Sequence, residues 1–211
     1  MTIRYVMGSL LLCSSCGAAA ASYDTRAREG QIKAIFNCTV RADSRLADKV
    51  VAGPSMSKEA RVLAKRLVGK MTPCMVQDPS RGAILQMNGL LIRGELARSQ
   101  LSRSHVATQT YSPPVIHPDS LPQNRAAADA EIIVTSFAGC LAKKSPEAAA
   151  TFVAADTGTA AERQAFSQLR PHIEGCQVEA SDYQISGDRL RAGLAIMLYS
   201  SRPTSSPGTA K

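Results

Sequence analysis

Apolar and polar residues alternate with the period of an α-helix along most of the chain. Between Lys58 and Met71 the apolar residues recur three or four positions apart, and they are Ala60, Leu63, Ala64, Leu67 and Met71. Basic residues occupy the opposite face of the same segment. This pattern predicts a helix over residues 58–71 with one face buried in a core and one basic face outside.

The same reasoning predicts helices over residues 26–40 and 43–51, with Asp43 as the N-cap of the second. In the second half, Ser145-Pro146 and the capping box Thr159 to Glu162 begin two further helices. Each half then closes with a short extended piece and a final helix that follows Asn88-Gly89 or Ser186-Gly187. The predicted fold is all-α, with eight helices in two groups of four.

The two groups also correspond in sequence. A shift of 102 residues aligns the segment around Cys38 and Cys74 with the segment around Cys140 and Cys176, so that Glu29 falls on Glu131. After the second cysteine the shift becomes 98, which aligns residues 85–97 with residues 183–195. We therefore predict an internal repeat of one helical module.

The repeat selects the disulfide pairing. Four cysteines remain after a leader is removed, and four cysteines allow three pairings. Because both copies space their cysteines 36 positions apart, we expect the bonds Cys38–Cys74 and Cys140–Cys176, one in each module. Each bond closes a loop and so stabilises the folded module by about 4 kcal/mol in the chain-entropy model. A module of this size has a small core and needs such stabilisation.

The N-terminus is typical of a secretory signal peptide. A basic start, an apolar stretch and a run of small residues predict a leader over residues 1–21, cleaved after Ala21. The apolar stretch is shorter than the ~20 residues that a membrane span needs, and no later segment is predicted to span a membrane. The protein is thus expected in the periplasm or outside the cell. Lipidation at Cys16 is the alternative.

These features divide the chain into five parts. They are a signal peptide (1–21), helical module 1 (24–103), a proline-rich linker (104–126), helical module 2 (127–200) and a disordered tail (201–211). The net charge of +8 lies in the first module, where residues 24–103 contain 15 basic and 7 acidic residues. Residues 127–202 contain 7 basic and 9 acidic residues. An anionic partner is therefore expected to bind the first module.

The tandem C-x35-C blocks, each followed by an Arg-Gly/Ala-x-Leu-Ala helix, resemble a group of exported tandem-repeat proteins from sphingomonad-type alphaproteobacteria. The resemblance covers most of the chain after the leader. It implies a periplasmic or secreted helical protein. It implies no activity, since none is assigned to that group.

Two sets of basic residues are candidates for binding. The first is the basic face with Lys58, Arg61 and Lys65, which could contact anionic lipid, polysaccharide or an acidic protein, or could be an ordinary solvated surface. The second consists of arginines at aligned positions, namely Arg61 with Arg163 and Arg93 with Arg191. These could bind a carboxylate or phosphate group, or could pair with an internal carboxylate and cap helix carbonyl groups.

Other chemistry has little support in the sequence. The three histidines have no metal-ligand spacing, so we predict no metal site and no cofactor. Export and few aromatic residues argue against nucleic acid. The protein is expected to bind or scaffold at an anionic partner in the cell envelope. The alternatives are a carrier of small anionic ligands, with the paired arginines in a cleft between the modules, and a hydrolase of unrecognised type.

Overall fold

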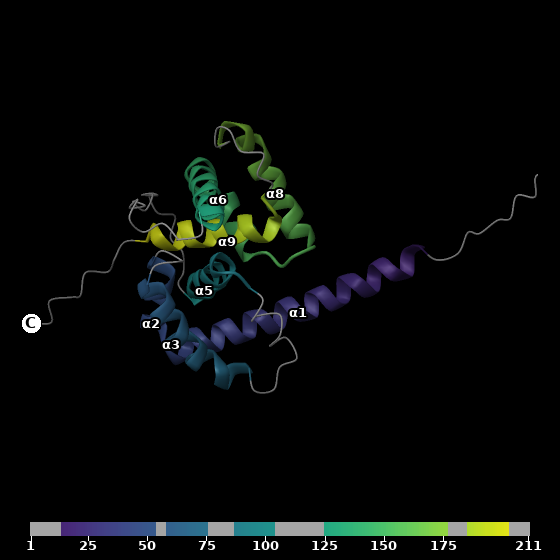
Figure 1. The fold of residues 1–211 in the computed structure, drawn as a ribbon. Coiled ribbons are helices and arrows are strands. Elements are labelled where there is room, and N and C mark those ends of the chain that lie inside the picture. Colours follow the sequence, from purple (N-terminus) through teal and green to yellow (C-terminus); the bar gives the residue numbers. More distant parts are fainter. Residues whose placement is uncertain (1–13, 54–57, 76–86, 104–124, 177–184, 203–211) are drawn as a thin grey trace, which may run out of the picture.

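The computed structural model describes residues 14–53, 58–75, 87–103, 125–176 and 185–202. The first module contains α1 (Ser14–Ala42), α2 (Ser44–Ala52), α3 (Lys58–Met75) and α5 (Gly89–Arg103). The second contains α6 (Arg125–Lys144), α7 (Pro146–Ala154), α8 (Ala160–Ile173), the 3-10 helix η2 (Glu174–Cys176) and α9 (Gly187–Ser200). The all-α fold of two four-helix modules is confirmed (Figure 1). The predicted extended pieces and most of the linker and tail lie outside the described residues.

The helices begin at the capping residues that the sequence indicated. The Asp43 carboxylate accepts a hydrogen bond from the Leu46 N–H at 3.0 Å, which satisfies one free N–H group at the start of α2. At the start of α8 the Thr159 hydroxyl accepts from the Glu162 N–H at 3.2 Å. The Glu162 carboxylate in turn accepts from the Gly158 N–H at 2.6 Å. Ser145 precedes α7 without a side-chain cap, and Pro146 occupies the first helical position.

Two helix boundaries differ from the prediction. Helix α1 begins at Ser14 rather than near Arg26, because the alanine run before Ser22 favours a helix. Helix α3 continues through Pro73 to Met75, four residues beyond the predicted end at Met71. Pro73 leaves the Gly69 carbonyl without its usual partner. Gly69 is exposed, so water can reach this carbonyl group.

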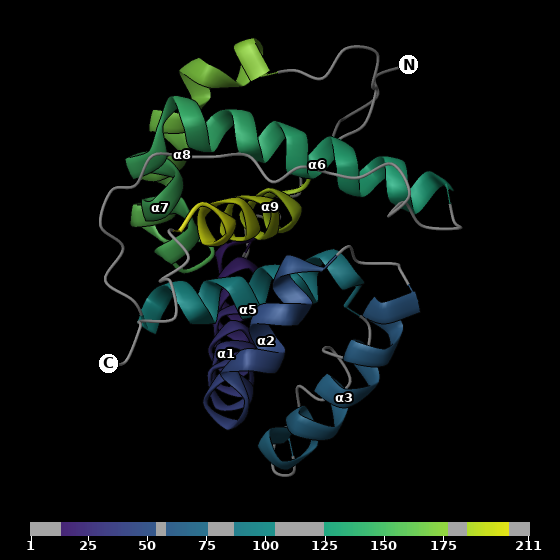
Figure 2. The same cartoon turned by 90° about the vertical axis from the view of Figure 1, so that its left-hand side faces the viewer.

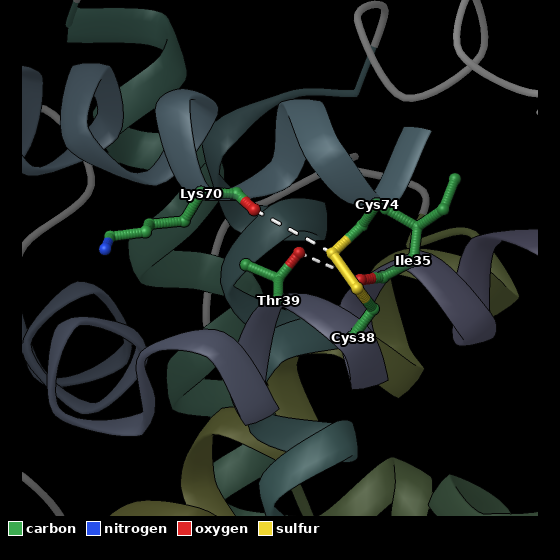
Figure 3. Close-up of a disulfide and its surroundings, with 5 residues drawn as sticks. All are labelled: Ile35, Cys38, Thr39, Lys70 and Cys74. Atoms are coloured by element: carbon green, nitrogen blue, oxygen red, sulfur yellow. Dashed lines mark hydrogen bonds between the residues drawn. A yellow bond between two sulfur atoms is a disulfide. The ribbon is translucent and has the colours of Figure 1, made fainter. Parts of the chain in front are cut away.

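Both predicted disulfides are present. Cys38–Cys74 joins α1 to the last turn of α3, with 5.9 Å between the Cα atoms. Cys140–Cys176 joins α6 to η2, with 5.6 Å between the Cα atoms. Figure 3 shows the first bond beside Thr39, whose hydroxyl donates to the Ile35 carbonyl at 2.8 Å within α1. Each bond fixes the outer end of a module whose other end is held by packing.

The last helix of each module lies at the centre of the molecule. Every residue from Leu96 to Leu101 in α5 and from Leu190 to Met197 in α9 is buried. A helix that is buried on all sides must be covered by other helices. In module 1, α1 and α2 cover α5, and in module 2, α6 and α7 cover α9.

The two modules meet where α5 crosses α9 (Figure 2). The helices approach closely at Gly94, where an added Cβ atom would lie 2.4 Å from Ala192 Cβ and 2.5 Å from Ala192 Cα. The 98-residue shift in the sequence aligns Gly94 with Ala192. Contact between aligned residues is what a two-fold relation between the copies requires.

We predict that Gly94→Ala destabilises the protein by about 1–3 kcal/mol, the usual cost of overpacking a core, because the methyl group forces α5 and α9 apart. Gly30→Ala is the matched control. Nothing lies within 4 Å of its added Cβ in α1, so the free energy of unfolding should stay constant or rise by up to about 1 kcal/mol. Urea unfolding followed by circular dichroism measures both. Equal stability of the two variants would contradict this packing.

Candidate functional site

Arg93 connects three helices in the interior. It lies on α5 and is 9% exposed. Its guanidinium donates to the Val51 carbonyl at the end of α2, with 3.3 Å from Nε and 2.8 Å from Nη2. It also forms an ion pair with Glu131 of α6, in the other module. Burial lowers the pKa of Arg93, and Glu131 opposes this effect.

Arg191 has a corresponding position in the second module. It lies on α9, is 4% exposed, and its Nε atom donates to the Phe152 carbonyl of α7 at 3.5 Å. The guanidinium also donates to the Thr157 hydroxyl at 2.9 Å and pairs with Glu162. Each of these arginines therefore binds a carbonyl near the end of the second helix of its module, together with a carboxylate.

The other aligned pair is different. Arg163 is exposed, and its guanidinium donates to the Gly158 carbonyl at 3.0 Å, just before its own helix. The side chain of Arg61 lies outside the described part of the structure. Arg93, Arg163 and Arg191 thus all donate to backbone carbonyl groups within the protein. This matches the expected helix-capping role, which is the alternative to ligand binding.

The first module carries a basic groove between α2 and α3. The groove has a volume of about 730 Å³ and lies beside Cys38–Cys74. Four basic residues line it, two from each helix, and they are Arg45, Lys49, Arg66 and Lys70. All four are exposed. The acidic residue of this lining, Asp43, already caps α2, so the groove presents a surplus of positive charge.

The aligned positions in the second module lack this charge. The 102-residue shift places Glu147, Thr151, Gln168 and His172 on the four basic residues of the groove. Both modules have corresponding helices and a disulfide between aligned cysteines, so the fold does not require the cations. The four cations that line the groove in module 1 therefore have no basic counterpart at the aligned positions of module 2.

Sequence reasoning found only part of this groove. It selected Lys65, which is exposed on α3, and Lys58 and Arg61, whose side chains lie outside the described part. Arg66 and Lys70 lie on the same helix as these residues, whereas Arg45 and Lys49 lie on α2, so a pattern along one helix does not bring the four together. The available signal was the comparison of aligned positions, at which Arg45 corresponds to an acidic residue, Glu147.

A second group of charges lies where the modules meet. Arg98 of α5 donates to Glu29 of α1 at 3.1 Å and to the Ala155 carbonyl after α7 at 2.7 Å. Lys33 of α1 forms an ion pair with Asp156. Burial alone would raise the pKa of Glu29, but hydrogen bonds from the Thr157 N–H and from Arg98 lower it overall. The Lys33 hydrogen bond is the main cause that lowers the pKa of Asp156.

Glu95 is the member of this group with the weakest pairing. Its carboxylate lies 3.7 Å from the Arg98 guanidinium, beyond hydrogen-bonding distance, and Arg98 already binds Glu29. Burial raises the pKa of Glu95, although Arg98 acts in the opposite direction. A largely buried carboxylate that pairs with its cation only at this longer distance is costly to the folded state.

The structure defines a helical protein stapled by two disulfides, which are typical of an oxidising compartment. None of the helices in the described ranges is long and apolar enough to cross a membrane. In those ranges no three His, Cys, Asp or Glu side chains are grouped to hold a metal ion. Comparison with protein-family models, curated proteins and solved structures gave no match.

We predict that Arg93→Gln lowers the free energy of unfolding by about 2–3 kcal/mol, because the Val51 carbonyl and Glu131 both lose their charged donor. Arg103→Gln is the matched control, since Arg103 is exposed in the last turn of the same helix. Denaturant unfolding of both variants measures the difference. Unchanged stability of Arg93→Gln would contradict a structural role for this arginine.

We predict that Glu95→Gln raises stability at pH 7. Because burial raises the pKa of Glu95 above its unfolded value, the folded protein binds this proton more tightly, and stability falls as the pH rises through that range. The gain should therefore shrink as the pH falls toward 4, where the carboxyl group is protonated in both states. Thermal unfolding from pH 4 to 7 tests this, with exposed Glu147→Gln as the control.

Proposed function

We propose that this protein is an exported binding protein of the cell envelope whose first module contacts an anionic partner. The residues before Ser22 would be a cleaved leader, and the two modules would be copies of one ancestral unit. This agrees with the resemblance to exported tandem-repeat proteins of sphingomonad-type bacteria. The two disulfides support export, because such bonds persist in oxidising compartments.

The observation that carries the proposal is the basic groove. Arg45 and Lys49 lie on one wall, and Arg66 and Lys70 lie on the other. Cations on facing walls attract a chain of negative charges that lies between them. Their absence at the aligned positions of module 2 indicates that they serve a contact rather than the fold.

The groove favours a polymer over a membrane surface. Its cations flank a concave channel between α2 and α3, and an extended chain can enter such a channel. A bilayer surface contacts convex or flat faces, and membrane-bound helices pair their cations with a broad apolar face. We therefore favour an acidic polysaccharide with regularly spaced carboxylate or phosphate groups.

We predict that changing Arg45, Arg66 and Lys70 together to Gln weakens binding to polygalacturonate about tenfold at 0.1 M salt. Each exposed ion pair contributes only about 0.2–1 kcal/mol, so three are needed for a clear effect. Isothermal titration calorimetry measures the affinity. Added salt should also weaken the binding of polygalacturonate by the unmodified protein, because salt screens the ion pairs.

The matched control changes Arg103, Lys143 and Arg170 to Gln, which removes the same charge from exposed positions outside the groove. Equal weakening by both triple variants would show that net charge alone drives binding, and would reject the groove as the site. Binding to phosphatidylglycerol vesicles but not to polygalacturonate would point to lipid instead.

A further inference from the structure

We propose that a cavity between the two modules binds a small primary amine that carries an apolar group, with Glu95 as its counter-ion. The cavity has a volume of about 550 Å³, within the range of small-ligand sites. It lies between α1 and α5 of module 1 and α7 and α9 of module 2. The proposal is independent of the basic groove.

Polar and apolar groups line different parts of the cavity. Lys33, Asn37, Glu95 and Arg98 come from α1 and α5. Apolar side chains come from α5, α7 and α9, and they include Leu101, Val153 and Leu198. A few polar groups beside an apolar wall are typical of sites that bind a ligand with one charged end.

The charge balance of the site selects a cation. Lys33 is paired with Asp156, and Arg98 binds Glu29 and the Ala155 carbonyl. These two cations are thus matched by two carboxylates, and Glu95 is the third carboxylate. A further cation that acts on Glu95, Arg191 of α9, is held by Glu162. A ligand ammonium group could donate hydrogen bonds to the Glu95 carboxylate at a shorter distance than the 3.7 Å of its ion pair with Arg98.

The residues that align with Lys33, Glu95 and Arg98 in module 2 show that the fold does not need these charges. There the sequence shift puts Thr135 in place of Lys33, Gly193 in place of Glu95 and Ile196 in place of Arg98. The Thr135 hydroxyl bonds the Glu131 carbonyl of its own helix at 2.8 Å. None of these three residues carries a charge.

Gly193 also lets α9 pack closely against α6. An added Cβ atom there would lie 3.0 Å from both Ala138 Cβ and Val134 Cγ1. At the position of Leu101 the second module has Tyr199, whose hydroxyl donates to Asp48 of α2. One of the two aligned places is therefore closed by packing and hydrogen bonds, and the other holds the cavity with a costly buried carboxylate. Such a cost is expected where a group is kept for binding.

The experiment measures binding of n-hexylammonium to the full protein by isothermal titration calorimetry and saturation-transfer NMR at pH 7. Hexanoate and 1-hexanol are controls with the same tail and a different head group. We expect a Kd on the order of 0.1–1 mM for n-hexylammonium. Both controls should bind at least about tenfold more weakly, because only the ammonium pairs with Glu95.

The variant Glu95→Gln keeps the shape of the site and removes its charge, and it is expected to fold because it relieves a buried carboxylate. Its affinity for n-hexylammonium should fall about tenfold. The control is Glu147→Gln, which changes an exposed carboxylate on α7 outside the cavity and should leave the affinity unchanged. Unchanged affinity in Glu95→Gln, tighter binding of hexanoate, or no binding of any of the three probes would overturn the proposal.

Discussion

The close crossing of α5 and α9 is the constraint on which the rest of the structure depends. Gly94 has no side chain, and Ala192 has a single methyl group, so the two helix backbones approach within contact distance. Because both helices are buried on all sides, each module needs the other to complete its core. Each disulfide joins two segments of the same module, α1 to α3 or α6 to η2, so it stabilises that module without linking it to the other.

The crossing also explains the roles of the buried arginines. Each central helix is covered on one side by a short helix, α2 or α7, whose last carbonyl groups lie inside the protein. Arg93 and Arg191 extend from the central helices to these carbonyl groups, and each balances its charge with a carboxylate. Arg93 reaches Glu131 in the other module, so it also links the two halves of the molecule.

Two of the places at which aligned residues of the modules differ in charge are surfaces that a partner could reach. One is the basic groove of module 1, where Arg45 and Lys49 correspond to Glu147 and Thr151. The other is the cavity between the modules, where Glu95 corresponds to Gly193. Residues that the fold needs, such as the cysteines and the capping arginines, are the same in both copies. Because the fold tolerates acidic or uncharged residues at these aligned positions of module 2, the charges of module 1 are candidates for binding rather than for stability.

The sequence by itself determined the helical fold, the two modules and the disulfide pairing. Helical periodicity, capping residues such as Asp43 and Thr159, and equal cysteine spacing are local or repeating signals, and a single chain displays them directly. Only the tertiary structure decided that Arg45 faces Arg66 across a groove, and that Glu95 lines a cavity. These side chains come from different helices. Which of them meet depends on how α2 packs on α3 within module 1 and on how α5 packs on α9 between the modules, and no local pattern in the sequence encodes either arrangement.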